Sequence, residues 1–264
     1  MARITPNLNI MIRAAEKAAR GLIRDFGEVE QLQVSQKGPG DFVSAADRKA
    51  EQVIFEELQM ARPDYGFLME ESGEKEGKDA DNRWIVDPLD GTTNFLHGIP
   101  HWAISIALEH KGEIIAGVVY DPIKDEMFRA EKNEGAFVSR RRLRVSGRTD
   151  LMDSVIGTGQ PRRAVEKQAK FMKEYAAVTA VAPAMRRYGA AALDLAYVAA
   201  GRLDGFWERD LKPWDVAAGY IILKEAGGFI SHIDDDRKDP VFTGNVLAGN
   251  DKIFTDLKKV LRAV

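Results

Sequence analysis

The sequence contains no cysteine. This absence excludes disulfide bonds, thiolate metal sites and cysteine nucleophiles, and it fits a protein of a reducing cytoplasm. The sequence also has no stretch that approaches the roughly 18 consecutive apolar residues of a membrane-spanning helix. Polar and charged residues interrupt its first 22 positions, so the apolar centre of a signal peptide is missing there. We therefore expect a soluble, cytoplasmic protein that does not associate with membranes.

An excess of positive charge is missing as well. The chain has 38 basic and 41 acidic residues, and its formal net charge is −3. Proteins that bind nucleic acid or anionic membranes generally are basic overall, so neither class is expected here. With 264 residues, of which 45% are hydrophobic and 30% charged, the chain can bury a large core in one domain or in two tightly fused ones.

Hydrophobic periodicity predicts a first half built from helices and an antiparallel sheet. Residues 8–26 and 44–60 place apolar side chains on one helical face, with a Gly/Pro loop expected at 37–40. Residues 84–86 read as a buried strand. Short turns separate the strand patterns that follow, which indicates a meander; these strands are expected at 103–108, 114–120, 126–130 and 135–138.

Strands and helices alternate in the second half, which favours α/β architecture. The helices are expected at about 163–176, at 190–200, from Pro213 to Gly227 and at the C-terminus, and the strands at 155–158, 229–233 and 246–248. The sequence therefore predicts an α/β fold in which a mainly antiparallel half, residues 1–145, packs beside a second α/β half, residues 146–264. The boundary falls near residues 140–150 without a linker-like composition.

The most informative segment is 84–95, WIVDPLDGTTNF. An apolar strand leads into Asp87, and Pro88 then bars a further ladder hydrogen bond, so we expect the chain to turn there. On such a turn the carboxylates of Asp87 and Asp90 can converge, with the carbonyl of Leu89 between them. A site made only of oxygen ligands suits Mg²⁺ or Mn²⁺ better than zinc.

The residues after Asp90 indicate a place for phosphate. Gly91 permits close approach of the backbone, and residues 92–94 look like the start of a helix, whose free N–H groups can bind an anion. A structural alternative is an Asx-type turn in which Asp90 caps that helix.

At this point the sequence resembles the inositol monophosphatase family, which belongs to the lithium-sensitive phosphatases together with the fructose-1,6-bisphosphatases. The segment 84–95 matches the first family signature. The second signature is present as WDVAAG at 214–219 and EAGG at 225–228, and a Glu-Glu-Ser element stands at 70–72. The resemblance implies a layered α/β sandwich like that of fructose-1,6-bisphosphatase, a homodimer, and metals at the junction of the two halves.

The resemblance also implies a ligand set for two to three Mg²⁺ ions, with Mn²⁺ as a substitute. The positions that match the family's ligands are Glu70, Asp87, the carbonyl of Leu89, Asp90 and Asp215. Clustered cations would neutralise an anionic phosphate ester and lower the pKa of the attacking water. Without metal these carboxylates would repel one another, so we expect metal to raise the stability of the protein.

The same resemblance implies the catalytic roles. Glu70 and Thr92 would serve as base and as orienting group for an in-line attack of water on phosphorus, and Asp47 would polarise Thr92. Backbone N–H groups of Gly91 and Thr92 would hold the phosphate. Asp47 has a structural alternative, because a carboxylate in the first turn of a helix also suits the helix dipole. Lys37 matches a basic residue of a loop near the third metal.

Substrate recognition is implied for Asp90, Ala191, Glu208 and Asp215, with Glu208 on the ring hydroxyls. The favoured reaction is hydrolysis of an inositol monophosphate to inositol and phosphate. Sister families act on fructose-1,6-bisphosphate and on 3′-phosphoadenosine-type nucleotides, and these substrates stay open as alternatives.

Two further sequence patterns have both a functional and a structural interpretation. His97 and His101 are four residues apart, the spacing of helical zinc ligands, but Pro100 lies between them and a zinc role is not expected. The region 140–148 holds five arginines, and Arg186 and Arg187 add two more. This basic patch supports an alternative from another class, a regulator that binds RNA or protein on a phosphatase fold, although a solvated turn explains it as well.

Overall fold

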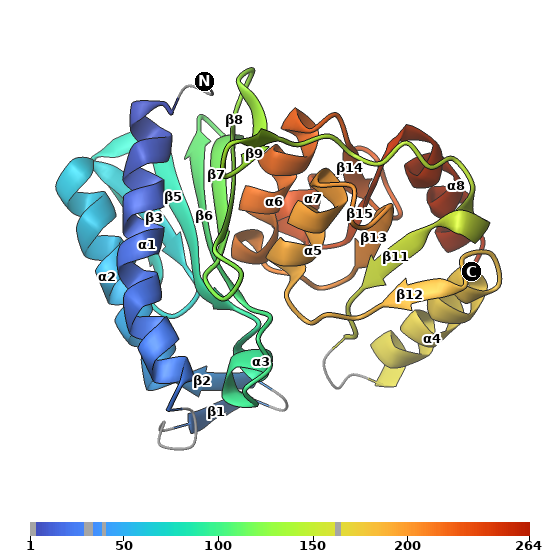
Figure 1. Ribbon diagram of the computed structural model, residues 1–264, viewed down its shortest axis with the longest axis horizontal. Helices are drawn as coiled ribbons and strands as arrows, with labels where there is room; N and C mark the ends of the chain where they lie inside the picture. Colours follow the sequence, from blue (N-terminus) through green and yellow to red (C-terminus); the bar gives the residue numbers. More distant parts are fainter. Residues whose placement is uncertain (1–3, 29–33, 39–40, 162–164) are drawn as a thin grey trace.

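The computed structural model describes residues 4–28, 34–38, 41–161 and 165–264; at 34–38 and 41–44 the description is of the backbone. Two β-sheets stand face to face with helices between them and on both outer sides (Figure 1). The predicted layered α/β sandwich is therefore confirmed. Among the helices of the described residues, none is long and apolar enough to cross a membrane.

The first sheet has eight strands in the order β10-β9-β8-β7-β6-β5-β3-β4. Their bounds are β3 (Tyr65–Met69), β4 (Gly73–Lys75), β5 (Asp79–Asp90), β6 (Ala103–His110), β7 (Glu113–Asp121), β8 (Glu126–Glu131), β9 (Gly135–Val138) and β10 (Arg141–Arg142). The predicted antiparallel meander is confirmed from β5 to β9. One neighbouring pair, β3 with β5, is parallel, and this pair matters for the site.

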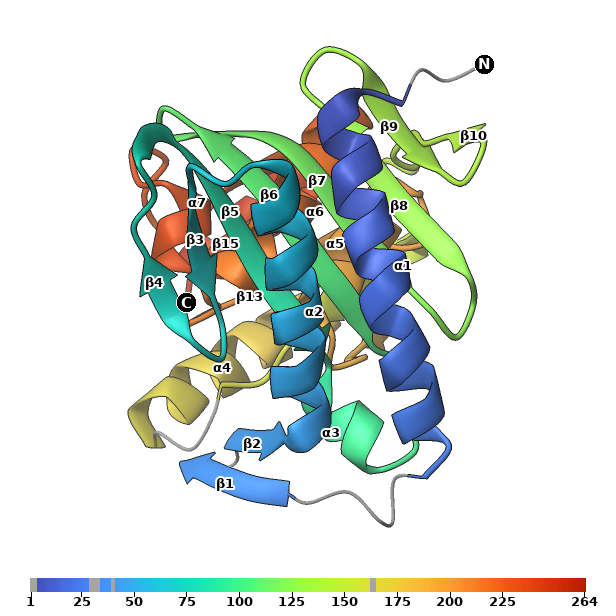
Figure 2. The same ribbon diagram turned by 90° about the vertical axis from the view of Figure 1, so that its left-hand side faces the viewer.

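Two long helices, α1 (Pro6–Phe26) and α2 (Ala45–Ala61), cover the outer face of this sheet (Figure 2). The inner face of α1 is mostly alanine, which lets the helix lie close to the strands. Leu8 and Met11 from α1 pack with Trp84 and Ile106 of the sheet in one buried cluster. Before α2, β1 (Val34–Gly38) and β2 (Asp41–Ser44) pair antiparallel. Residues 37–38 of the loop expected at 37–40 lie in β1, and residues 39–40 lie outside the described part of the chain.

The layer between the two sheets consists of α5 (Ala191–Ala199) and α6 (Pro213–Glu225). Their packing requires glycine at two contacts. A Cβ at Gly117 of β7 would lie 2.6 Å from Cγ2 of Ile221, and a Cβ at Gly219 would lie 2.6 Å from Cβ of Leu195. Small residues thus let α6 touch both the first sheet and α5, and this contact brings α6 to the site.

The second sheet has five strands in the order β12-β11-β13-β15-β14. Their bounds are β11 (Val155–Thr158), β12 (Ala184–Arg186), β13 (Gly205–Glu208), β14 (Phe229–His232) and β15 (Val246–Gly249). β11 is parallel to β12 and to β13, whereas β15 is antiparallel to both of its neighbours. On the outer side lie α4 (Val165–Thr179) and α8 (Asp251–Arg262). Short elements complete the chain: α3 (Thr92–Leu96), η2 (Leu151–Asp153) and α7 (Pro240–Thr243).

The change of sheet follows β10, close to the predicted boundary at residues 140–150. However, α6 comes from the second half and packs on the first sheet. The division into a first half, residues 1–145, and a second half, residues 146–264, stays a prediction.

Candidate active site

The sequence led us to expect that the chain turns out of the sheet after Asp87. The structure shows instead that it stays in the sheet. β5 continues to Asp90, and its pairing with β6 shifts register between Asp87, opposite Ser105, and Asp90, opposite Ala103. Pro88 has no N–H to donate, and the irregularity takes it out of the ladder without ending the strand. The N–H of Leu89 donates to Oδ1 of Asp87 at 2.9 Å, so Asp87 itself forms the Asx turn.

Asp90 is fixed from the other half of the molecule. The backbone N–H of Ala192, in the first turn of α5, donates to Oδ2 of Asp90 at 2.7 Å. The alternative in which Asp90 caps the following helix is wrong, because the N-cap of α3 is Gly91 and no side-chain cap bond is found there among the described residues. Asp90 is 8% exposed and belongs to the junction of the two halves.

Asp215 reaches the same place from the start of α6. The N–H of Lys212 donates to Oδ2 of Asp215 at 2.7 Å in a capping box. The hydroxyl of Ser105 donates to the backbone carbonyl of Trp214 at 3.0 Å. Since Ser105 is also the ladder partner of Asp87, this one serine ties the start of α6 to the strand position opposite Asp87.

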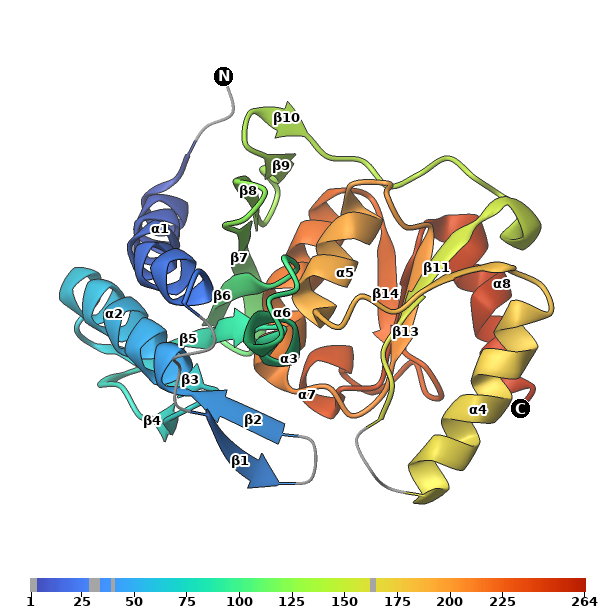
Figure 3. The ribbon, with the colours of Figure 1, turned by 60° about the horizontal axis from the view of Figure 1, so that its bottom comes forward.

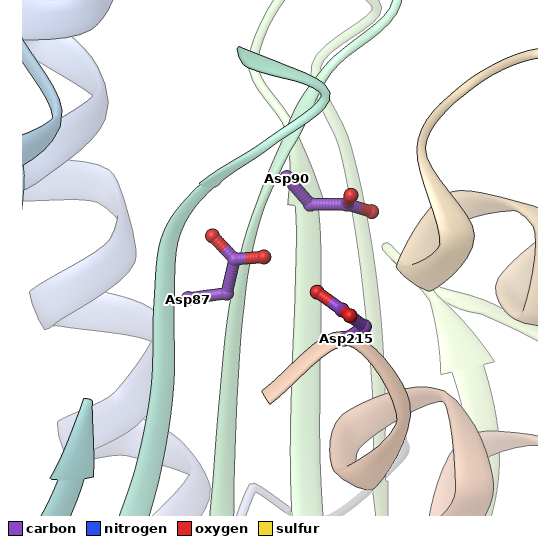
Figure 4. A group of neighbouring side chains, drawn as sticks. All are labelled: Asp87, Asp90 and Asp215. Carbon is purple, nitrogen blue, oxygen red and sulfur yellow. The ribbon is translucent and has the colours of Figure 1, made fainter. Parts of the chain in front are cut away.

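The three aspartates converge. Ligand oxygens of Asp87, Asp90 and Asp215 all lie within 4.8 Å of one another. Figure 4 shows their carboxyl groups facing a common space, with Asp215 on the opposite side from β5. Burial, and then the charges of Glu70 and Asp90, raise the pKa of Asp87 well above its usual value. Burial, and then the charge of Asp215, do the same for Asp90. Such mutual repulsion among oxygen-only donors fits a site for a hard divalent cation.

Glu70 lies beside Asp87 because β3 and β5 run parallel. Met69 pairs with Val86, so the residues that follow each strand emerge next to each other. The N–H of Glu70 donates to the carbonyl of Val86 at 3.2 Å, and a hydrogen bond with Glu70 contributes to the raised pKa of Asp87. Glu51 of α2 holds the next residue, accepting from the N–H of Glu71 at 2.8 Å.

The segment predicted to bind phosphate, residues 91–94, directly follows Asp90 in the chain. Gly91 has φ +93°, a left-handed conformation that favours glycine. The hydroxyl of Thr92 donates to the carbonyl of Leu89 at 3.0 Å, which brings two predicted site groups into contact. Asn94, which sequence reasoning did not assign, donates from Nδ2 to the carbonyls of His101 and Tyr188, each at 2.8 Å. It therefore links this loop to the segment that leads into α5.

The remaining predicted residues lie on other elements or outside the described part. Asp47 is 2% exposed in the first turn of α2, which agrees with its structural alternative and leaves the catalytic role a prediction. Ala191 begins α5, and its N–H contributes to holding Asp90. Glu208 ends β13. The side chain of Lys37 lies outside the residues that the structure describes.

Sequence reasoning missed Ser105, Asn94 and Asp194. Asp194 is 1% exposed on α5, and burial raises its pKa, followed by the charges of Glu208 and Asp90. Its position in an apolar helical stretch was the one available signal, since a buried carboxylate among Ala and Leu is rare in a helix that has only a packing role. His97 and His101 do not join the acidic cluster found among the described residues.

The fold and the site define a class: a layered α/β protein whose clustered carboxylates suit divalent cations. Comparison with known proteins agrees. A model of the inositol monophosphatase family matches residues 4–263. A protein named inositol-1-monophosphatase from Mesorhizobium japonicum is 58% identical over 255 residues, 97% of this chain and 96% of that protein. A protein named Nus factor SuhB from Escherichia coli is 43% identical over 248 residues, 94% of this chain and 92% of that protein.

Among solved structures, extragenic suppressor protein suhB from Bartonella henselae matches with a TM-score of 0.94 and 54% sequence identity, covering 98% of this chain and 99% of that one. The chain therefore belongs to the inositol monophosphatase family, as the resemblance predicted, and it is a phosphoric monoester hydrolase.

Proposed function

We propose that the protein hydrolyses inositol monophosphate to inositol and phosphate in a reaction that depends on Mg²⁺. The observation that carries the proposal is the convergence of Asp87, Asp90 and Asp215 within 4.8 Å. Oxygen ligands alone favour Mg²⁺, with Mn²⁺ as a substitute, over softer metals. The relative from Mesorhizobium japonicum that is 58% identical is named for this activity.

Five groups would hold two to three ions. Asp87, Asp90 and Asp215 would form the centre, Glu70 would add a carboxylate beside Asp87, and the carbonyl of Leu89 would complete the set. When bound, Mg²⁺ would neutralise the ester phosphate and lower the pKa of the attacking water. The carbonyl of Leu89 now accepts the Thr92 hydroxyl, so Thr92 stands one hydrogen bond from this ligand.

The protein's own groups orient water and phosphate and move the proton. Glu70 would accept a proton from the attacking water, and the Thr92 hydroxyl would orient that water, with Asp47 polarising Thr92. Backbone N–H groups of Gly91 and Thr92 would hold the phosphate oxygens, as free N–H groups at a helix start do. Attack in line with the leaving oxygen needs no covalent intermediate.

The leaving alcohol would face the second half of the chain. Ala191 offers backbone contact at the start of α5, and Glu208 offers a carboxylate that can accept hydrogen bonds from ring hydroxyls. Asp90 and Asp215 would line the same space. Fructose-1,6-bisphosphate and 3′-phosphoadenosine nucleotides are the competing substrates.

A phosphate-release assay across these three substrates tests the proposal, with Mg²⁺, with Li⁺ added and with a chelator. We expect inositol monophosphate to give the highest kcat/KM, and chelation to abolish turnover. Glu208→Gln should lower kcat/KM for inositol monophosphate and leave the Mg²⁺ dependence unchanged. Turnover that persists in chelator, or a clear preference for one of the competitors, would show that the proposal is wrong.

A second candidate is a regulator that binds RNA or protein. The 43% identity with proteins named Nus factor SuhB favours it, and Arg140, Arg141 and Arg142 are exposed at an edge of the first sheet. Retention of RNA that weakens with added salt would support this role, and absence of binding at low salt would exclude it. Homodimer formation, inhibition by lithium and a cytoplasmic location remain predictions from the family resemblance.

A further inference from the structure

Asp194 is a buried carboxylate that the proposed mechanism does not use. It belongs to α5, and Figure 3 shows this helix between the strands of the two sheets. All nine residues of α5 are buried, and Asp194 is 1% exposed. Its Oδ1 atom has no hydrogen-bond partner among the residues that the structure describes. A carboxylate buried in this way costs free energy, because nothing replaces the water that it has lost.

A second buried aspartate of the same half shows what Asp194 lacks. Asp204, just before β13, is also 1% exposed. It accepts hydrogen bonds from three donors, which are the hydroxyl of Ser146, the guanidinium of Arg148 and the backbone N–H of Val155. At equal burial, the fold thus satisfies an aspartate that has a structural role. A buried charge that is left without such donors needs another explanation, and an effect on a nearby functional site is one.

The first turn of α5 places Asp194 beside the acidic cluster. The N–H of Asp194 donates to the carbonyl of Ala190 at 3.0 Å, so these two residues lie one above the other on the same helical face. Cβ of Ala190 lies 3.3 Å from the position of a Cβ on Gly91, the residue after Asp90. In the same turn, the N–H of Ala192 donates to Oδ2 of Asp90 at 2.7 Å. Because helical side chains tilt toward the N-terminus, the carboxylate of Asp194 leans toward this contact.

The electrostatics of Asp194 agree with this placement. Burial raises its pKa most, and the charges of Glu208 and Asp90 raise it further. The exposed Arg187 acts in the opposite direction, and its effect is the smallest of these. Asp194 therefore adds to the negative field at Asp90 from a position where solvent screens it little.

We propose that Asp194 sets the affinity of the carboxylate cluster for divalent cations. Its buried negative charge strengthens the binding of a cation at Asp90 and destabilises the metal-free protein. Asp194 acts through the field and not as a ligand, because its oxygens are not part of the group formed by Asp87, Asp90 and Asp215 among the described residues. Its burial also keeps it from contact with a leaving alcohol. The inference rests on the metal site of the proposed function and is independent of the substrate.

Asp194→Asn tests the inference, because it removes the charge and keeps the shape of the side chain. Metal-free protein is titrated with Mn²⁺, and binding is followed by the loss of the electron paramagnetic resonance signal of the free ion. We expect the dissociation constant for Mn²⁺ to rise about 10-fold in Asp194→Asn. In urea denaturation with EDTA, the midpoint should rise above that of the wild type, since the uncompensated buried charge is gone. Loss of an aspartate with only a structural role would lower this midpoint.

Asp204→Asn is the matched control, since it changes an equally buried aspartate that has its hydrogen bonds. It should lower the urea midpoint and leave the dissociation constant for Mn²⁺ unchanged. An unchanged Mn²⁺ affinity in Asp194→Asn, a lower urea midpoint or a failure of this variant to fold would overturn the inference. A wild-type protein that binds no Mn²⁺ would contradict the metal site and the inference with it. Binding of Mn²⁺ without hydrolysis of inositol monophosphate would contradict the proposed substrate alone, and the two dissociation constants would still decide the role of Asp194.

Discussion

The backbone N–H of Ala192 donates a 2.7 Å hydrogen bond to the carboxylate of Asp90, joining residues 102 positions apart. Through this bond the start of α5, which belongs to the second half, holds a side chain of the first sheet. Two further links act at the same junction: Ser105 binds the carbonyl of Trp214, and Asn94 binds the carbonyl of Tyr188. The acidic cluster therefore depends on the correct packing of the two halves.

Removing one charge from the cluster should stop catalysis without unfolding the protein. Asp90→Asn and Asp215→Asn should each lower kcat by roughly 100-fold or more, because each loses part of the several kcal/mol of charge stabilisation that bound cations supply. Asp81→Asn, an exposed position on β5, is the matched control. Steady-state kinetics together with circular dichroism measures both effects, and near-wild-type kcat in either cluster variant would refute its assignment as a ligand.

Ser105 should affect metal affinity although we assign it no contact with metal. Ser105→Ala removes the bond to the carbonyl of Trp214 and frees the start of α6, so the Mg²⁺ concentration for half-maximal activity should rise about 10-fold. Ser231→Ala, which removes a local bond to the carbonyl of His232, should change it little. A Mg²⁺ titration of activity gives the value for each variant. An unchanged half-maximal concentration in Ser105→Ala would mean that α6 is positioned without this hydrogen bond.

Gly159 should control the position of Glu208. A Cβ at Gly159 would lie 1.8 Å from Oε1 of Glu208, so Gly159→Ala must displace this carboxylate. We expect KM for inositol monophosphate to rise about 10-fold, whereas p-nitrophenyl phosphate, which lacks ring hydroxyls, should be hydrolysed as before. At Gly147 a Cβ meets nothing within 4 Å, and Gly147→Ala is the control. Equal losses for both substrates would show that Gly159 supports the fold and not the recognition of the alcohol.

Without metal, the stability of the protein should fall as the pH rises. Burial and neighbouring carboxylates raise the pKa of Asp87 and of Asp90 above the usual 3.8, so above that pH the folded state holds protons that the unfolded state has released. This contribution is fully present below the unfolded pKa and is lost as the pH rises through the folded pKa.

Urea denaturation in EDTA between pH 5 and 8 measures this dependence. Mg²⁺ should reverse the trend and, at 100 times its dissociation constant, stabilise the protein by about 2.7 kcal/mol. Asp90→Asn should flatten the slope in EDTA. A metal-free protein that grows more stable over this range would contradict the assigned pKa directions.

Sequence-based prediction was most accurate for features that residues close together in the chain determine. The succession of strand patterns and short turns from 103 to 138 predicted the meander. The segment 84–95 placed Asp87 and Asp90 together, because only two residues separate them and one turn decides their distance. The helix at the second signature likewise began at Pro213, as expected.

Local sequence patterns could not predict which distant strands pair, or in which register. The parallel pairing of β3 with β5 puts Glu70 beside Asp87, but an apolar run followed by an acid is equally compatible with an antiparallel neighbour. The same holds for Ser105 opposite Asp87, which arises from the pairing of β5 with β6. The prediction that the strand ends before Pro88 was wrong, because a register shift in the pairing with β6 accommodates the proline within β5.

The central claim is that the carboxylate cluster is a metal site that drives hydrolysis of inositol monophosphate. Its most direct test is the initial rate of phosphate release from inositol 1-phosphate by chelator-treated protein as Mg²⁺ is added back. We predict a rate near zero without Mg²⁺ that rises and saturates, with the curve lost in Asp215→Asn. A rate that does not depend on Mg²⁺, or an Asp215→Asn curve that matches the wild type, would contradict the account.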